Sequence, residues 1–299
     1  MEKVSYQGWQ NCVRLSNGEI ELIAPTEIGP RIMRLGFIGE ENEFVEFPDD
    51  LGKTRDSFHR IYGGHRLWHS PEDAVRTYIP DNDPLVVMEL PEGGVRLTQP
   101  VEAVTNIQKE MDITLAADKN EVTVVHRMYN RGLWPVRLAL WGLSQMAQGG
   151  VGIFPLPPRG THAENLLPTS RMALWAYTEI GDPRWTWGKQ YVLLRQDPQV
   201  AAPQKVGFTN TEGWMAYARN GHLLVKFIAP MARCHYPDMG VNVETFTNDA
   251  ILELETLSPM VSIAPGESAE LAERWLLVKG ITDICNDADV VQQVLPHIQ

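Results

Sequence analysis

The sequence has little cysteine. Its three cysteines, Cys12, Cys234 and Cys285, are odd in number, far apart and without a C-x-x-C spacing. This pattern indicates neither a disulfide framework nor a cysteine-based zinc site. We expect three reduced thiols that act as small core residues.

The chain also lacks a basic cluster and a long apolar run. Acidic residues outnumber basic ones by 38 to 26, which gives a formal net charge of −12. No cluster of Lys and Arg stands out that could bind the phosphates of a nucleic acid, so nucleic acid is not expected as a partner. The opening MEKVSYQGWQ contains no signal-like apolar segment, and no stretch approaches the roughly 18 apolar residues of a membrane helix. We therefore expect a cytoplasmic protein without a membrane partner.

What the chain does have is enough apolar material for a large core. Of its 299 residues, 43% are hydrophobic and 21% are charged. Neither an internal repeat nor a change in composition marks a boundary. We expect a single domain over residues 1–299, since all-β domains often reach this length. The oligomeric state stays open, with a homo-oligomer among the options.

Short alternating runs joined by turn residues dominate the pattern. Asn17-Gly18 and Asn220-Gly221 favour tight hairpins, because Gly adopts the positive φ angles that such turns require. The predicted strands are 12–15, 19–24, 31–37, 43–47, 85–90, 95–99, 107–115, 121–130, 136–146, 214–218, 222–228, 242–247, 251–257 and 274–279. They predict an all-β fold, a large antiparallel β-sandwich with few helices.

Two segments depart from this pattern. Residues 149–184 are rich in Pro, Gly and aromatics, which favours a long ordered excursion over one sheet face. Near the end, Thr282 or Asp283 could cap a short helix at about 283–295 that carries Val290, Val291 and Val294.

The segment GGHRLWHSPE, Gly63 to Glu72, concentrates chemically active side chains. It combines His65, Arg66, Trp68 and His69 with the carboxylate of Glu72. Imidazole exchanges protons near neutral pH, guanidinium offers a fixed fork of donors, and an indole face stacks on sugar C–H groups. The Gly pair and Pro71 favour a strand end or loop that contacts a polyhydroxylated ligand.

Two other interpretations of this segment stay open. Each His alone could satisfy backbone groups beside a core Trp68. The spacing His65-x-x-x-His69 with Glu72 also imitates a zinc motif, although that motif needs a helix and Gly63, Gly64 and Pro71 oppose one.

Further candidates lie elsewhere in the chain. Asp81 is part of an acidic turn, YIPDNDP, that could accept sugar hydroxyls or simply be an Asx turn. Trp141 could belong to a stacking wall or to the core. In ILELETL, strand alternation places Glu253 and Glu255 on one face. Carboxylates framed by apolar residues have raised proton affinity and can act as general bases, although a solvated strand face would show the same alternation.

The C-terminal stretch VETFTNDAILELETLSPMVSIAPGESAELAERWLLV, Val243 to Val278, resembles the closing part of galactose mutarotase-like proteins. In these proteins, a strand bearing LET precedes a PGE turn and a final strand. Together with the Gly-Gly loop, the likeness extends loosely over most of the chain, and it is similar to a branch with a GGHRLW motif.

The resemblance implies an aldose 1-epimerase-like protein, in which a Glu takes the proton of the anomeric hydroxyl and a His protonates the ring oxygen. Matched residue by residue, Glu255 is the implied base with Glu253 as its neighbour. His65 and His69 are the implied acid and orienting group. Arg66, Trp68, Glu72, Trp141 and Asp81 are the expected contacts to a small carbohydrate, and neither a metal nor an organic cofactor is needed.

One departure keeps an alternative open. The family's usual acid is a second His on a middle strand, where this chain reads Leu140-Trp141-Gly142-Leu143-Ser144. A sugar-binding protein without catalysis therefore stands beside the epimerase, and a His-dependent metal hydrolase is a third hypothesis.

Overall fold

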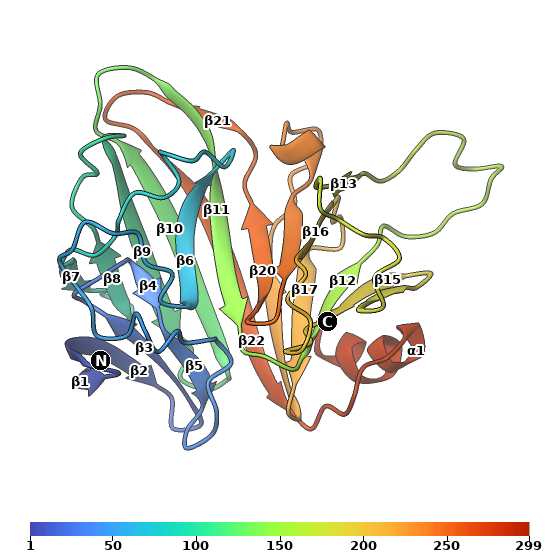
Figure 1. Cartoon of the computed structure of the whole chain (residues 1–299), viewed down its shortest axis with the longest axis horizontal. Coiled ribbons are helices and arrows are strands. Elements are labelled where there is room, and N and C mark those ends of the chain that lie inside the picture. Colours follow the sequence, from blue (N-terminus) through green and yellow to red (C-terminus); the bar gives the residue numbers. More distant parts are fainter. Residues whose placement is uncertain (299) are drawn as a thin grey trace.

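The computed structural model describes residues 1–298, which form three antiparallel β-sheets with little helix (Figure 1). The predicted antiparallel β-sandwich is confirmed. Among the helices of this described part, none is both long and apolar enough to cross a membrane.

The four-stranded sheet is formed by strands from the start of the chain, and the two larger sheets draw their strands from along the rest of it. The four-stranded sheet has the order β1 (Glu2–Tyr6), β2 (Trp9–Ser16), β3 (Ile20–Pro25) and β5 (Arg34–Phe37). The ten-stranded sheet has the order β14 (Trp185–Trp187), β15 (Tyr191–Arg195), β12 (Val151–Pro155), β17 (Trp214–Arg219), β18 (His222–Phe227), β22 (Ser268–Lys279), β10 (Glu121–Asn130), β9 (Ile107–Leu115), β8 (Val95–Thr98) and β7 (Val86–Glu89). The eight-stranded sheet has the order β13 (Met172–Leu174), β16 (Gln204–Phe208), β19 (Val243–Thr247), β20 (Leu252–Leu257), β11 (Val136–Met146), β6 (Gly64–Ser70) and β4 (Arg31–Ile32), with β21 (Val261–Ile263) paired to β11.

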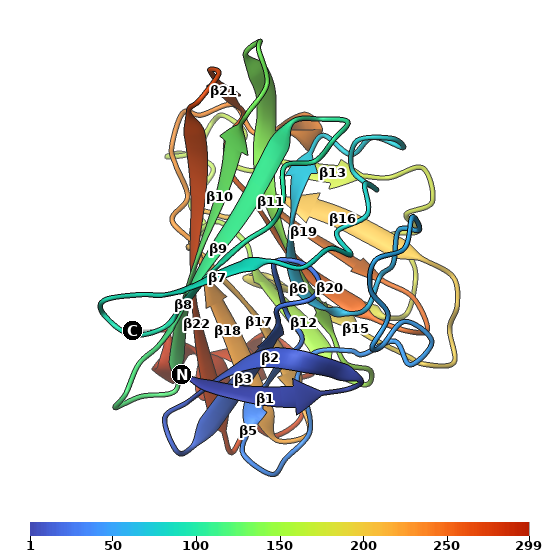
Figure 2. The same cartoon turned by 90° about the vertical axis from the view of Figure 1, so that its left-hand side faces the viewer.

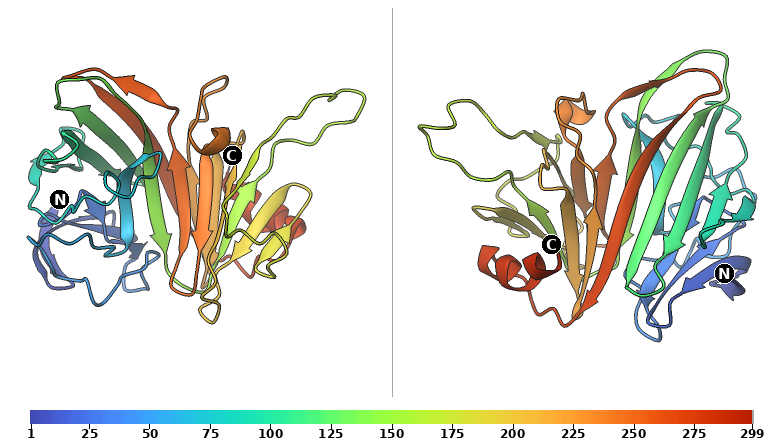
Figure 3. Two further views of the ribbon diagram at one scale, coloured as in Figure 1. Left: turned by 45° about the horizontal axis from the view of Figure 1, so that its top comes forward. Right: turned by 180° about the vertical axis from the view of Figure 1, so that it is seen from behind.

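The main core lies where the three sheets meet. Leu254 of β20 and Leu224 of β18 belong to one apolar cluster with Leu22 of β3. The long strands β22, β10 and β9 lie side by side in the ten-stranded sheet (Figure 3). One face of the eight-stranded sheet is thus buried against the ten-stranded sheet, and the other face points away from this core.

Local turn chemistry explains the hairpins that the sequence indicates. Gly18 has a φ of 92°, and the Asn17 side chain accepts the backbone N–H groups of Glu19 and Ile20 between β2 and β3. At the β17–β18 turn, Asn220 and Gly221 both have positive φ, at 49° and 83°. Both predicted hairpins are confirmed.

The Gly-Gly segment is a strand rather than the expected strand end or loop. All seven residues of β6 are buried, and β6 pairs with β11 on one side and β4 on the other. A Cβ on Gly64, whose φ is 75°, would lie 2.3 Å from the carbonyl oxygen of Ile32. The expectation was wrong because a strand covered on both faces shows no alternation of polar and apolar residues.

Other boundaries also differ. Residues 31–37 form two strands in different sheets, β4 and β5, and residues 43–47 make only isolated bridges. Residues 149–184 include the regular strands β12 and β13. The loop 156–171 between them extends away from the sheets (Figure 1), so it does not lie over a sheet face.

The C-terminal segment is helical, as expected, but begins later. Helix α1 (Asp287–Asp289) is capped by Asn286, and a π-helical turn (Val290–Val294) and a 3-10 turn (Leu295–His297) follow. The predicted caps Thr282 and Asp283 were wrong, because the Asn286 side chain accepts the N–H groups of Ala288 and Asp289. Val290 and Val294 pack on the ten-stranded sheet in an apolar cluster with Ile153 and Trp214.

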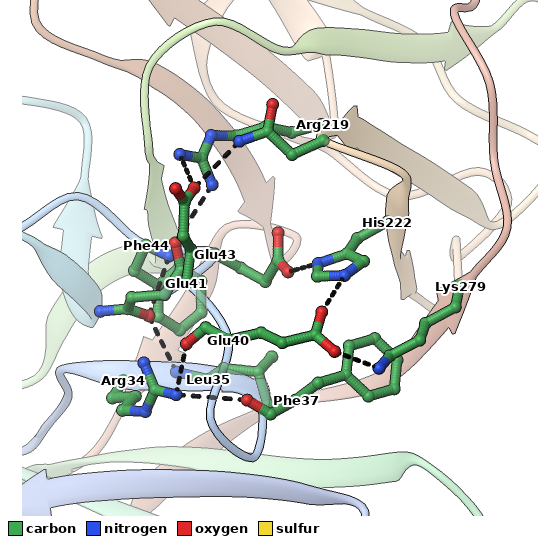
Figure 4. A network of polar contacts seen from close by, with 12 residues as sticks. Arg34, Leu35, Phe37, Glu40, Glu41, Glu43, Phe44, Arg219, His222 and Lys279 are labelled. Atoms are coloured by element: carbon green, nitrogen blue, oxygen red, sulfur yellow. Dashed lines mark hydrogen bonds and ion pairs between the residues drawn. The ribbon is translucent and has the colours of Figure 1, made fainter.

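A polar network fastens the four-stranded sheet, which lies beside the sandwich (Figure 2), to the ten-stranded sheet. The ring of His222 on β18 contacts two carboxylates of the segment after β5, Glu43 at 2.7 Å through Nδ1 and Glu40 at 2.8 Å through Nε2 (Figure 4). Lys279 pairs with Glu40, and Arg219 pairs with Glu41 at 2.6 Å. Charged contacts therefore hold this junction in addition to the apolar core.

Candidate functional site

Strand alternation divides the side chains of β6 between the two faces of the eight-stranded sheet. His65 lies opposite Ser144 of β11, and the next residue, Arg66, lies opposite Leu143. His65 points into the sandwich, where it contacts His126 of the ten-stranded sheet at 2.7 Å. Arg66 and Trp68 consequently point to the other face, which we call the polar face.

The two glutamates of β20 share the polar face with Arg66. Glu255 lies opposite Leu143, and Glu253 lies opposite Gln145. Leu254, between them, packs in the main core. The face placement that the sequence predicts for Glu253 and Glu255 is therefore confirmed, and Arg66, two strands away, lies on the same surface.

Glu255 is held in a buried ion pair. Its Oε2 accepts hydrogen bonds from Trp141 Nε1 and from Lys205 Nζ, both at 2.9 Å. The Lys205 ammonium also contacts Glu244 Oε2 at 3.0 Å and lies 4.8 Å from the centre of the Trp141 ring. Burial alone would lower the pKa of Lys205, but Glu255 and Glu244 outweigh it and raise that pKa. Lys205 therefore stays charged at neutral pH.

Glu253 behaves differently, although it lies only two residues away. The residue is half-buried, and its Oε1 accepts a hydrogen bond of 2.9 Å from Gln145 Nε2. Burial, followed by the negative charge of Glu255, raises the pKa of Glu253 to about 7. Near neutral pH this carboxyl group can both accept and release a proton.

Arg66 supplies an unsatisfied cation to the same face. Its guanidinium carbon lies 3.6 Å from the centre of the Trp68 ring, and its Nε and Nη1 have no hydrogen-bond partner within residues 1–298. Burial, and then the charge of Arg31, lowers the pKa of Arg66 to about 9, which leaves it protonated at neutral pH. Its free donors can bind acceptor oxygens of a ligand.

Aromatic side chains surround this guanidinium. The ring of His59 lies 5.9 Å from Trp68 and 5.2 Å from Tyr78, and Tyr78 lies 5.3 Å from Trp68. Both nitrogens of His59 are buried without a partner among the described residues. Burial, and then the charge of Arg66, lowers the pKa of His59 to about 4, so its ring is neutral at pH 7.

The polar face therefore gathers orphaned polar atoms. Buried polar atoms without partners are rare in proteins and call for a ligand or water. Besides those of Arg66 and His59, the unpartnered atoms here are Gln145 Oε1, Glu244 Oε1 and Glu255 Oε1. Such a mixture of donors and acceptors beside aromatic rings suits a polyhydroxylated molecule.

Comparison with known proteins shows which known structures have a similar fold. No protein-family model matches the sequence, and no curated protein matches it. Among solved structures, a galactose mutarotase-like protein from Lactobacillus casei has a TM-score of 0.59 at 10% identity, covering 90% of this chain and 100% of that one. A galactose mutarotase related enzyme from Lactobacillus acidophilus has a TM-score of 0.58 at 8% identity, covering 92% and 99%. A Klebsiella pneumoniae protein provisionally described as an aldose 1-epimerase has a TM-score of 0.60 at 11% identity, covering 97% and 84%.

The chain has the galactose mutarotase-like fold. The resemblance in the sequence is thereby confirmed at the level of fold. Function still has to be argued from the side chains of this chain, because one fold can carry different functions.

Within this mutarotase-like fold, the inward face holds His65 in a chain of hydrogen bonds. His126 Nδ1 donates to the carbonyl oxygen of Leu271 at 2.9 Å, so its Nε2 accepts from His65 Nε2 at 2.7 Å. His65 Nδ1 then accepts from Ser144 Oγ at 2.8 Å, and Ser144 Oγ accepts from Lys226 Nζ at 3.0 Å. All four ring nitrogens of His65 and His126 therefore have a hydrogen-bond partner.

This cluster is also the group of residues that could hold a metal ion. One ligand atom each of His65, His126 and Glu273 lie within 4.8 Å of one another, and all three residues are buried. However, the Lys226 ammonium already lies 3.2 Å from Glu273 Oε2. A lysine thus provides the positive charge that this carboxylate needs, which makes the cluster a poor fit for a cation.

The structure does not bring His65 or His69 together with Glu255. His69 lies on the same inward face as His65, and its Nε2 donates to the carbonyl oxygen of Arg76 at 3.1 Å. The anticipated grouping of imidazole and carboxylate in one site is absent from the described residues, because odd and even positions of β6 face opposite ways.

The other expected ligand contacts divide into three groups. Trp68 and Trp141 lie on the polar face, with ring centres 5.4 Å apart. Glu72 is exposed and accepts a hydrogen bond from Tyr78. Asp81 pairs with Arg31 Nη2 at 2.9 Å, so it balances the charge of that arginine.

Several residues of the polar face escaped the sequence reasoning. Lys205, Gln145 and His59 come from segments that showed no motif. A lysine beside the apolar run Val206 to Phe208 of β16 was the one local signal, since charged side chains are rarely buried without a partner.

Proposed function

We propose that the polar face binds a carbohydrate and interconverts its anomers by acid–base chemistry, with Glu253 as the group that exchanges the proton. The carrying observation is the pair of carboxylates on β20. Glu255 is ion-paired to Lys205, while burial and Glu255 raise the pKa of Glu253 to about 7. A carboxyl group with a pKa near the working pH is suited to general acid–base catalysis.

Anomer interconversion needs a proton to leave the anomeric hydroxyl, and it needs the charge that develops on the ring oxygen to be stabilised while the ring is open. In our proposal, ionised Glu253 accepts the hydroxyl proton while the bond between the anomeric carbon and the ring oxygen breaks. The free Nε and Nη1 donors of Arg66 stabilise the charge that develops on the ring oxygen. Rotation and reclosure on the other face, with return of the proton from Glu253, give the second anomer.

The remaining groups would hold the sugar. Neutral His59 offers a donor and an acceptor, and Glu255 Oε1 is a free acceptor. The exposed rings of Tyr78 and Tyr177 can stack on C–H faces of the sugar. His65 and His69 have no part in the proposal, because both side chains point to the other face of the sheet.

The printed names of the structural neighbours support the same ligand class. Two of them are described as galactose mutarotase-like or related, and a third is provisionally described as an aldose 1-epimerase. These names describe those proteins, and at 8–11% identity they lend support through the fold alone.

A non-catalytic sugar-binding protein is the second candidate. The observation in its favour is the outward side of β11, where Trp141, Leu143 and Gln145 supply no imidazole. Under this alternative the polar face would hold a sugar without transferring protons.

A panel of aldoses separates the two candidates. Anomer exchange is followed by NMR, and sugar binding by calorimetry, for the wild type, Glu253→Gln and the exposed control Glu92→Gln. We expect faster exchange with the wild type and the control, and binding without acceleration in Glu253→Gln. Sugar binding without acceleration by the wild type would favour the non-catalytic candidate, and neither binding nor acceleration would refute both.

A further inference from the structure

A cavity separate from the polar face opens at the end of the sandwich. It has a volume of about 440 Å³ and is lined by β6, β9, β11 and the loop before β9. Pockets of a few hundred Å³ are the usual size for small-molecule sites. His69, which has no role on the polar face, contributes to its wall.

The lining combines apolar side chains with positive charge. Ile107 and Leu138 are buried apolar residues, while the exposed Arg76 and Arg137 supply two guanidinium groups. No carboxylate is among the described residues of this lining, although the chain carries a net charge of −12. The cavity is therefore locally positive on an acidic protein.

The nearby carboxylates are already engaged. Asp73 pairs with Arg76 at 3.4 Å and offsets part of the charge of that guanidinium, and Asp238 accepts a hydrogen bond of 3.1 Å from Ser70 Oγ. Arg137, which lies in β11 opposite Ser262, has no ion pair or side-chain hydrogen bond within residues 1–298. Its guanidinium is available to a ligand.

His69 adds a free nitrogen. Because its Nε2 donates to a carbonyl oxygen, the Nδ1 of the neutral ring is an acceptor, and no described residue pairs with it. The charged groups around the ring are Lys109 and Glu102, which pair at 2.6 Å, and Arg76. Burial, and then Lys109, lowers the pKa of His69 to about 4. A bound anion would oppose this effect and favour the protonated ring.

We propose that this cavity is a second binding site, for a small organic anion with an apolar body, in which Arg137 and Arg76 hold the charged group beside His69. The apolar body would lie against Ile107 and Leu138. His69, Ile107 and Leu138 lie on the inward side of the sheet, and neither Glu253 nor Arg66 lines the cavity, so the proposal does not rest on the proposed sugar chemistry.

Benzoate and its neutral isostere benzamide test the proposal. Titration calorimetry is run on the full chain above pH 5.5, where benzoate is charged, with the variants Arg137→Gln and Arg137→Lys. The matched control is Arg131→Gln, which removes an arginine of the loop between β10 and β11 that donates a hydrogen bond to Gln108 instead. Both positions are exposed, so folding is not at stake.

We expect saturable benzoate binding, no comparable binding of benzamide, at least about a tenfold loss in Arg137→Gln and partial rescue in Arg137→Lys. Arg131→Gln should bind as the wild type does, and NMR should show the His69 ring shifting on titration. Equal binding of benzamide, unchanged affinity in Arg137→Gln, or no benzoate binding up to about 10 mM would each overturn the proposal.

Discussion

Lys205 and Glu255 form a buried ion pair, with 2.9 Å between Nζ and Oε2, on the sheet face that also carries Glu253. Removal of the ammonium in Lys205→Met would leave Glu255 and Glu244 buried without their cation. We expect a loss of about 3–5 kcal/mol in the free energy of unfolding, measured by chemical denaturation. The double variant Lys205→Met/Glu255→Gln should be less destabilised, and equal losses would contradict this account.

The pH dependence of stability reports on Glu253. Burial and Glu255 raise its folded-state pKa from 4.5 to about 7. Between these values the folded state keeps a proton that the unfolded chain releases, so the stability from this proton is complete below pH 4.5 and is lost as pH rises through 7. Glu253→Gln has no such proton to lose. We therefore expect its free energy of unfolding to rise, relative to that of the wild type, by on the order of 2 kcal/mol between pH 5 and pH 8. Parallel curves for the two proteins would contradict the assignment.

The buried imidazoles should stay neutral. Burial lowers the pKa of His65 and of His126, and the hydrogen bonds place a proton on His65 Nε2 and on His126 Nδ1. We expect nitrogen NMR to show these tautomers without titration from about pH 8 to 5. Titration of either ring in that range, or stoichiometric zinc in protein purified without chelator, would show that Lys226 is not the cation of this cluster.

The junction in Figure 4 offers a matched comparison of two charged contacts. Burial raises the pKa of Glu43 against the opposing effect of His222, its partner at 2.7 Å. His222→Leu removes that partner and should destabilise the protein by about 2–4 kcal/mol. The loss should be largest above pH 7, because there the buried Glu43 must either stay charged without its partner or bind a proton at a higher cost in free energy. Lys279→Met removes the exposed contact to Glu40 and the ammonium that lies 4.1 Å from the centre of the Phe37 ring, so we expect a change of about 1 kcal/mol or less. Thermal or chemical unfolding of both variants tests the difference, and equal effects would argue against it.

Much of the fold follows from local sequence, because turn residues and alternation act over a few positions. Asn17-Gly18 and Asn220-Gly221 mark their hairpins, and the alternation of β10 is visible in its residues. The strands that escaped prediction, such as β6 and β16, are buried over their whole length and show no alternation.

The candidate site was less accessible to sequence reasoning. The shared face of Glu253 and Glu255 is a local property of one strand, and it was predictable. Their contact with Lys205 depends on the order β16, β19, β20 in the sheet, which no local pattern reveals. The opposite directions of His65 and Arg66 follow from alternation once β6 is known to be a strand, but a loop interpretation hides them.

The proposed role of Glu253 is tested most directly by the pH dependence of anomer exchange. The rate is measured by NMR between about pH 5 and 9 for the wild type and Glu253→Gln, with an aldose that both proteins bind. We expect the wild-type rate to rise with pH and to level off above an inflection near the pKa of Glu253, about 7. Glu253→Gln should be slower by about 10²-fold or more, without that inflection. Equal rates and the same inflection in both proteins would contradict the account.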